Sequence, residues 1–197
     1  ALFVYKASLP TAVGVTAMYL NTTGTNNTAV GQSSLKKNTT ASGNTAIGRV
    51  ALFENTTGSN NTAVGYAALQ LNVTGLSNVA VGQGSLQNSL SNNNTAVGYS
   101  AAYNLTTGND NVCVGRSAGF SMTTHNENVF IGKNAGYSCT SSQNVMVGGE
   151  GCGDSVTTGS ECVFVGAFAG TDVTTGSGNV LIGPSAGHNI TTASNNT

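Results

Sequence analysis

The side chains that could do chemistry are few and far apart in this sequence of 197 residues. Its two histidines, His125 and His188, have no cysteine, aspartate or glutamate set around them at metal-ligand spacing. The seven carboxylates are spread along the chain, so none suggests a pair for general acid and base catalysis. The glycine-rich stretches lack the Lys-Ser/Thr ending and the following helix of a phosphate-binding loop. The sequence therefore predicts a protein without catalysis, metal or cofactor.

Four cysteines, all in the C-terminal part of the chain, are the remaining reactive groups, and their even number is compatible with disulfides. Cys113 stands where earlier repeats have alanine, and Cys139 lies in a later turn. Cys152 and Cys162 flank the loop GDSVTTGSE and could bridge it. Such a bridge would favour an oxidising location.

Composition restricts the partners of the chain. Hydrophobic residues make up 39% of the sequence and can build a core, but only 7% are charged, so Asn, Thr, Ser and Gly must supply the polar surface. A formal net charge of −1 gives no electrostatic basis for binding nucleic acid or an acidic membrane surface. No apolar run approaches the roughly 20 residues of a membrane span. We therefore expect neither nucleic-acid binding nor membrane insertion.

A short motif, N-[TV]-A-[VI]-G, dominates the chain and positions every other residue. Val or Ile always precedes its glycine, and Asn stands four residues before the glycine in nine of eleven copies. Below, a position such as −2 or +4 is counted from this glycine. The eleven glycines are 16 to 18 residues apart: Gly14, Gly31, Gly48, Gly65, Gly82, Gly98, Gly115, Gly132, Gly148, Gly166 and Gly183.

Each repeat predicts a short strand, a bend at the glycine and a turn of Asn, Thr and Gly. One such unit cannot bury its apolar side, but eleven stacked units can. The sequence therefore predicts an all-β parallel β-solenoid over residues 10–197, with residues 1–9 as a lead-in or cap. At the spacing of about 4.8 Å between strands, eleven coils would give a rod on the order of 50 Å long.

Two apolar compartments are expected, because positions −2 and −1 are both apolar and adjacent strand residues point to opposite faces. Position −2 is Ala in the first six repeats and then becomes larger, as in Phe130 and Phe164, while +4 changes from Leu52 or Leu69 to Gly136. This exchange predicts that −2 packs against +4 at constant volume. We expect −1 and +3 to share a second compartment, covered by another copy of the chain.

The core N-x-A-[VI]-G-x-x-[AS], as in NTAVGYAAL and NVAVGQGSL, resembles the head repeat of trimeric autotransporter adhesins. The longer cadence NTTGSNNTAVGYAAL is similar to repeats in tail-fibre-like proteins of phages, large DNA viruses and some bacteria. The resemblance covers residues 10–197. It implies a left-handed parallel β-roll with three chains around one axis, serving as a shaft or adhesive head. The repeat is longer here than in adhesin heads.

The exposed +1 position predicts one surface column that could bind a saccharide or another receptor group. Its ordinary alternative is a solvated ladder. The members of this candidate column are Gln32, Arg49, Tyr66, Gln83, Tyr99, Arg116 and Lys133.

N-x-[ST] sequons recur because the turn NTTG creates one each time, so a stacked polar side chain or a turn-forming asparagine is their default interpretation. In a eukaryotic secretory route they could carry glycans. The candidate sites are Asn21, Asn38, Asn55, Asn72, Asn104 and Asn189.

We expect a structural and attachment fibre on a virion or cell surface, which is an extracellular location. Because the sequence stops inside a repeat, end-to-end assembly is also expected, and a secreted filament subunit is an alternative.

An ice-binding solenoid is another alternative, which low charge and abundant Thr permit. Against it, Thr28 shares a strand face with Val30, which is expected to be buried. A polysaccharide-cleaving enzyme would need a carboxylate cleft that the sequence does not offer.

Overall fold

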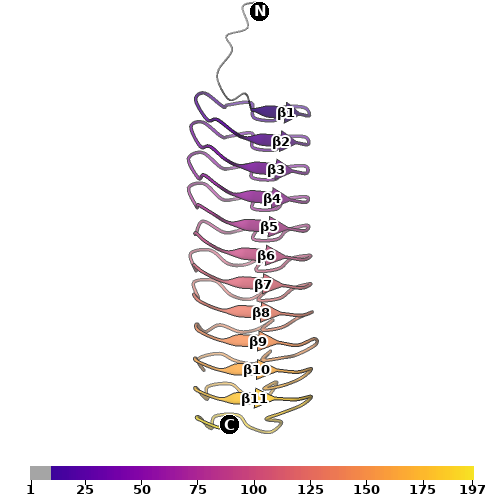
Figure 1. Cartoon of the computed structure of the whole chain (residues 1–197), viewed down its shortest axis with the longest axis vertical. Coiled ribbons are helices and arrows are strands. Elements are labelled where there is room, and N and C mark those ends of the chain that lie inside the picture. Colours follow the sequence, from indigo (N-terminus) through magenta and orange to yellow (C-terminus); the bar gives the residue numbers. More distant parts are fainter. Residues whose placement is uncertain (1–9) are drawn as a thin grey trace, which may run out of the picture.

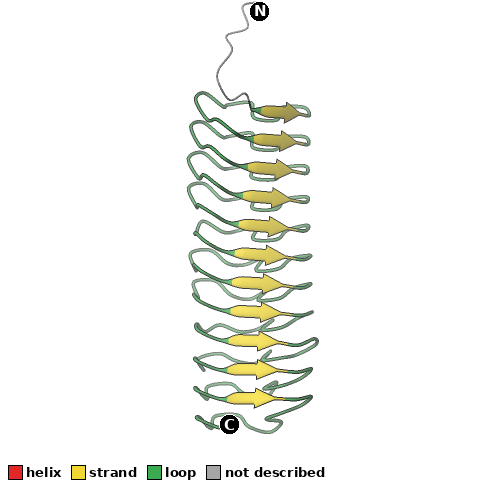
Figure 2. Cartoon of the chain, in the orientation of Figure 1, coloured by secondary structure: helices red, strands yellow, loops and turns green. Residues whose placement is uncertain are grey.

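The computed structural model describes residues 10–197, which form a straight rod of stacked coils (Figure 1). Each coil contributes one three-residue strand, and the rest of the coil is turn or loop (Figure 2). The predicted parallel β-solenoid is confirmed, whereas the lead-in expected at residues 1–9 lies outside the described residues. The strands are β1 (Thr11–Val13), β2 (Thr28–Val30), β3 (Thr45–Ile47), β4 (Thr62–Val64), β5 (Val79–Val81), β6 (Thr95–Val97), β7 (Val112–Val114), β8 (Val129–Ile131), β9 (Val145–Val147), β10 (Val163–Val165) and β11 (Val180–Ile182).

The eleven strands form one parallel sheet in sequence order, and equivalent residues of successive repeats lie in register. In the pairing of β2 with β3, for example, Ala29 lies beside Ala46 and Val30 beside Ile47. Every sequence position therefore becomes a column that runs along the rod. This is why a single phase of the repeat can define a surface or a core layer.

The glycine after each strand is required by backbone geometry. Gly65 has a φ of +138°, a conformation that side-chain-bearing residues rarely adopt. A Cβ at Gly65 would also lie 2.6 Å from the carbonyl of Gly82 in the next coil. The chain bends at this point, and the coils approach too closely for any side chain.

A buried asparagine at position −4 fastens each coil to its neighbours. The backbone N–H of Asn61 donates to Oδ1 of Asn44 at 2.9 Å, and its own Nδ2 donates to the carbonyl of Gly75 at 2.8 Å. Asn78 continues the ladder through its N–H to Oδ1 of Asn61. Because each amide satisfies buried backbone groups, the motif needs Asn there rather than an apolar residue.

The interior of the rod is a single apolar lumen in which −2, +3 and +4 pack together. Direct contact between −2 and +4 is confirmed, since a Cβ added at Gly136 would lie 2.8 Å from the ring of Phe130. The predicted second compartment is wrong. Ala135, at +3, is fully buried in the same lumen, while Ile131, at −1, points outward and is 39% exposed.

The 18-residue repeat carries its extra residue between Gly148 and Cys152. The N–H of Gly136 donates to the carbonyl of Cys152, and the N–H of Gly153 donates to Ala169. Cys152 therefore occupies the +3 place and Gly153 the +4 place, one position later than counting from Gly148 suggests. Gly153 in turn faces Met146, as the exchange between −2 and +4 requires.

Position +7 divides the rod into two halves. In the first four coils it is asparagine, and Asn55 donates from Nδ2 to Oδ1 of Asn38 at 3.0 Å and to the carbonyl of Gly58 at 2.9 Å. From the sixth coil the same column is apolar and begins with Leu105 and Met122, both fully buried. At the boundary Ser89 bonds to Ser91, and Oδ1 of Asn72 has no partner within residues 10–197.

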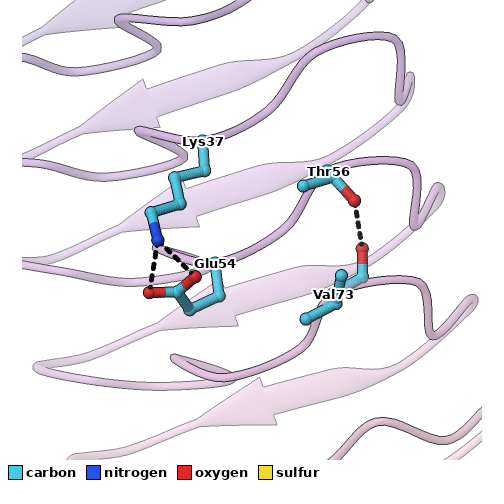
Figure 3. Close-up of polar contacts among 4 residues, drawn as sticks. All are labelled: Lys37, Glu54, Thr56 and Val73. Carbon is cyan, nitrogen blue, oxygen red and sulfur yellow. Dashed lines mark hydrogen bonds and ion pairs between the residues drawn. The ribbon is translucent and has the colours of Figure 1, made fainter.

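On the surface, side chains also bond along the rod axis. Lys37 places Nζ 2.7 and 3.0 Å from the carboxylate oxygens of Glu54 in the next coil (Figure 3). The hydroxyl of Thr56 donates to the carbonyl of Val73 at 3.1 Å (Figure 3). Equivalent turn threonines repeat this bond in several coils. These turn hydroxyls are thus occupied by the rod itself.

Candidate binding surfaces of the rod

The residues that could do chemistry remain apart in the fold. Within residues 10–197, no three His, Cys, Asp or Glu side chains lie together as a metal-binding group. His125 lies in a turn, where its Nδ1 is 3.4 Å from the N–H of Thr123 and partial burial lowers its pKa. His188 lies in the last coil, with Nδ1 3.0 Å from the carboxylate of Asp172.

All four cysteines are buried free thiols, so the bridge suggested between Cys152 and Cys162 is not formed. Their sulfurs belong to different columns: that of Cys152 is 3.6 Å from the carbonyl of Phe164, and that of Cys162 is 3.3 Å from the carbonyl of Gly176. Burial raises the pKa of the Cys113 and Cys139 thiols, and it raises the pKa of Cys152 to about 11. These thiols are core residues with low nucleophilicity.

Three of the six sequon asparagines are unavailable for glycosylation in this fold. Asn38, Asn55 and Asn72 are fully buried, and the Nδ2 that would carry a glycan donates two hydrogen bonds in each. Their role is structural, as members of the ladder at +7. Asn189 is exposed, and Asn21 and Asn104 are partly buried, so these three stay predicted sites.

The outward side of the strands forms an apolar surface that continues from coil to coil. We call the residues at −3 and −1 of β2 to β11 the outer face. The −1 residue is aliphatic in every coil, and it is 36% exposed at Val30 and 40% exposed at Ile47. At −3 the face carries mainly Thr up to β6 and Val from β7 onward. The outer face is therefore amphipathic in the N-terminal half and wholly apolar in the C-terminal half.

The predicted +1 column is present, and all seven of its residues are exposed. It runs beside the outer face, just beyond the bend at the glycine. Tyr66 is 48% and Tyr99 51% exposed, and the guanidinium of Arg49 lies 5.8 Å from the ring centroid of Tyr66. Large exposed aromatic rings next to amides and cations are suited to polar ligands such as saccharides.

A second aromatic column, at +5, was missed by the sequence reasoning. Tyr103, Phe120 and Tyr137 stack on one another with centroid distances of 5.6 and 5.1 Å. Higher in the same column, the Nζ atoms of Lys36 and Lys37 lie 5.5 and 5.4 Å from the ring of Phe53. Three aromatic residues at the same phase of successive repeats were the signal for this stack. Because the rings face each other, they stabilise the rod more than they offer a stacking surface to a ligand.

Comparisons of the chain with family models, curated proteins and solved structures found no match. A membrane-spanning helix, with the length and hydropathy that it requires, is not found in the part of the chain from residue 10 to 197. The class that the geometry defines is a β-solenoid rod with a long apolar outer face and an exposed column beside it.

Proposed function

We propose that this chain is a structural and attachment fibre: a rod-like trimeric shaft or adhesive head on a virion or cell surface, which binds a surface receptor without catalysis. The observation that carries the proposal is the outer face, whose aliphatic −1 column is partly or fully exposed in every coil from β2 to β11. Exposed apolar areas of this extent mark interaction sites in water-soluble proteins. Another copy of the same chain supplies a matching stripe of equal length.

The shape of the outer face supports lateral association between copies. Ten spacings between eleven strands give a length of about 50 Å, and the three-residue strands give a width of about 10 Å. A stripe of this width matches a partner of the same straight, regular shape. Three copies would bury their stripes around one axis, as the resemblance to adhesin heads implies, with left-handed coils.

The attachment role is assigned to the N-terminal part of the +1 column. Tyr66 and Tyr99 present exposed rings, and Gln32 and Gln83 present amides at the same phase. Such a ladder offers repeated contacts, and repeated weak contacts raise avidity in a multivalent fibre. The alternative, a secreted filament that grows by end-to-end assembly, uses the same rod. It differs from the attachment fibre only in the partner that each end of the rod contacts.

The proposal is tested by sedimentation velocity, which reports both mass and elongation. The wild-type chain is expected to sediment as an elongated trimer, and the double variant Val114→Asp/Ile131→Asp as an elongated monomer. The matched control is Thr106→Asp/Thr123→Asp, which adds the same charges in the turn column. A wild-type chain that remains a monomer at all concentrations would overturn the proposal.

Ice binding is a second candidate, because the fold removes the objection that the strand face of Thr28 is buried, although that face holds Thr with Val or Ile rather than the flat T-x-T array of an ice plane. Thr28 and Val30 share a strand face, but that face points outward, and so do those of Thr45 and Thr62. No hydrogen bond within the described residues engages these three hydroxyls. A monomer that shows thermal hysteresis, lost in Thr45→Lys, would favour this function over the fibre.

A further inference from the structure

Charged residues border the outer face on both sides in its C-terminal half. Position −5 lies two residues before the outward residue at −3, and position +1 lies two residues after that at −1. In the β7 coil these positions hold Asp110 and Arg116, and in the β8 coil they hold Glu127 and Lys133. All four are exposed. One edge of the face is therefore acidic and the other basic at the same two heights of the rod.

These charges do not neutralise each other within a coil. The three-residue strand and the glycine bend lie between the two edges. Asp110 and Arg116 form no ion pair within residues 10–197. Glu127 accepts a hydrogen bond from Nε2 of Gln143 at 3.1 Å, and Lys133 pairs along the rod with Glu150. The first two charges thus lack partners, and the other two keep free bonding capacity toward the outside.

We propose that the two edges pair between copies and so fix a parallel, in-register assembly. This inference rests on the proposed lateral association through the outer face. When two parallel rods bring these faces together, the −5 edge of one copy lies beside the +1 edge of the next. The same holds for three rods around one axis. Asp110 then meets Arg116 of the neighbour, and Glu127 meets Lys133 of the neighbour.

The charges also select the register. With coils at equal height, both pairs are of opposite sign and no like charges meet. In the 18-residue coil, Glu150 extends the +1 edge through its ion pair with Lys133, and Glu161 lies at −5 of the β10 coil. A shift by one coil in one direction places Glu127 beside Glu150 of the neighbour. A shift in the other direction places Glu161 beside Glu150 of the neighbour. Because like charges across an interface are costly, each shifted register loses an attractive pair and gains a repulsive one.

An antiparallel arrangement is disfavoured for the same reason. Turning one rod end over end brings each edge against its own counterpart. With β7 opposite β8, Arg116 would face Lys133 and Asp110 would face Glu127. The aliphatic stripe alone cannot make this distinction, since its −1 residues are nearly the same in every coil.

The assignment divides the +1 column. Arg116 and Lys133 serve assembly, while the members from Gln32 to Tyr99 stay available to a ligand.

The inference is tested by two charge-reversal variants of the full chain. In the acidic variant, Arg116→Glu/Lys133→Glu, and in the basic variant, Asp110→Lys/Glu127→Lys, both edges carry one sign. Each variant alone is expected to dissociate at a protein concentration at least about tenfold higher than the wild type at low salt. Mixed in equal amounts, the two are expected to recover only part of the assembly, because a ring of three chains made from two variants keeps one like-charged interface. The control, Lys36→Glu/Lys37→Glu, changes the net charge equally, away from the edges, and should assemble normally.

A second set of variants leaves Lys133 unchanged, because Lys133→Glu also removes the ion pair with Glu150 of the same chain and could disturb folding. Asp110→Arg and Arg116→Asp should each weaken assembly, and the two together should restore it. A wild-type monomer would refute the proposed fibre itself. A wild-type trimer whose variants all assemble unchanged would refute only the edge pairing. Weakening that the double exchange does not rescue would also overturn it.

Discussion

The two halves of the rod fill the same backbone coil in different ways. In the β3 coil, Leu52 reaches the lumen from position +4 above the small Ala46, with a left-handed φ of +50°. In the β8 coil, Phe130 fills that space from −2, and Gly136 takes the left-handed position with a φ of +58°. A leucine in this conformation is strained by about 1 kcal/mol, and glycine is not. The coil therefore fixes the volume of the lumen, but the large side chain that fills it can come from either −2 or +4.

The halves also differ in how they satisfy position +7. The N-terminal half runs a hydrogen-bonded asparagine ladder through its interior, whereas the C-terminal half stacks Leu105, Met122 and Val156 there. A ladder of amides can end only by leaving one group without a partner. That group is Oδ1 of Asn72, opposite Ser89. The junction between the two halves is therefore a local weak point.

The largest effect is expected when the residues at −2 and +4 of a C-terminal coil are replaced by the types found in the N-terminal half. Phe130→Ala should lower the free energy of unfolding by about 3 to 5 kcal/mol, because it leaves a cavity. Gly136→Leu should also destabilise the rod, because its side chain meets the ring of Phe130. The double variant should recover most of the loss, as measured by urea unfolding in a double-mutant cycle. Additive losses would contradict the exchange of volume between −2 and +4.

The asparagine ladder should tolerate apolar replacement poorly. Asn55→Leu leaves Oδ1 of Asn38 without its donor and takes the Oδ1 acceptor from Nδ2 of Asn72, and a buried unsatisfied group costs about 1 to 3 kcal/mol. The matched change in the other half, Met122→Leu, should cost less than about 1.5 kcal/mol. Thermal unfolding of both variants checks the difference. Equal losses would show that the two columns are not distinct in kind.

A smaller, stabilising effect is expected at Cys162, which interrupts the −4 ladder inside the rod. The thiol of Cys162 approaches the carbonyl of Gly176 but provides no amide oxygen for the N–H of Asn179. Cys162→Asn should supply both bonds and raise the free energy of unfolding by about 1 kcal/mol. Cys162→Ala serves as the control and should give no gain. A loss of stability in Cys162→Asn would mean that the coil at this point cannot accept the ladder geometry.

The smallest effect concerns the buried thiols of the C-terminal half. Burial raises the pKa of Cys152 from 9.0 to about 11, so the folded rod favours the protonated thiol. The resulting stabilisation is complete below pH 9 and is lost as the pH rises from 9 to 11. Urea midpoints should fall across this window, and less steeply in Cys152→Ala. At pH 8 the native chain should not react with Ellman's reagent, whereas the unfolded chain should.

The repeat made the fold and the lumen predictable. The period of the repeat predicted the coil. The exchange of large and small residues between −2 and +4 predicted the contact of Phe130 with Gly136. The outward position of Val30 was missed because an aliphatic residue in every coil resembles a core residue, and sequence pattern does not say whether a second layer belongs to the same chain. The stacking of Asn55 on its neighbours was one of the two default interpretations of the turn asparagines, but the sequence did not decide between them or show that the amide is buried. The aromatic stack at Phe120 was missed although its three members share one phase of successive repeats in the sequence.

The most direct test of the central claim is the mass per unit length of the rod, measured by scanning transmission electron microscopy. One chain of 19.6 kDa along about 50 Å corresponds to roughly 0.4 kDa per Å. Lateral association of three chains predicts roughly three times this linear density, whether or not rods also join end to end. The linear density of a single chain would contradict the account, because the outer face would then lie open to solvent.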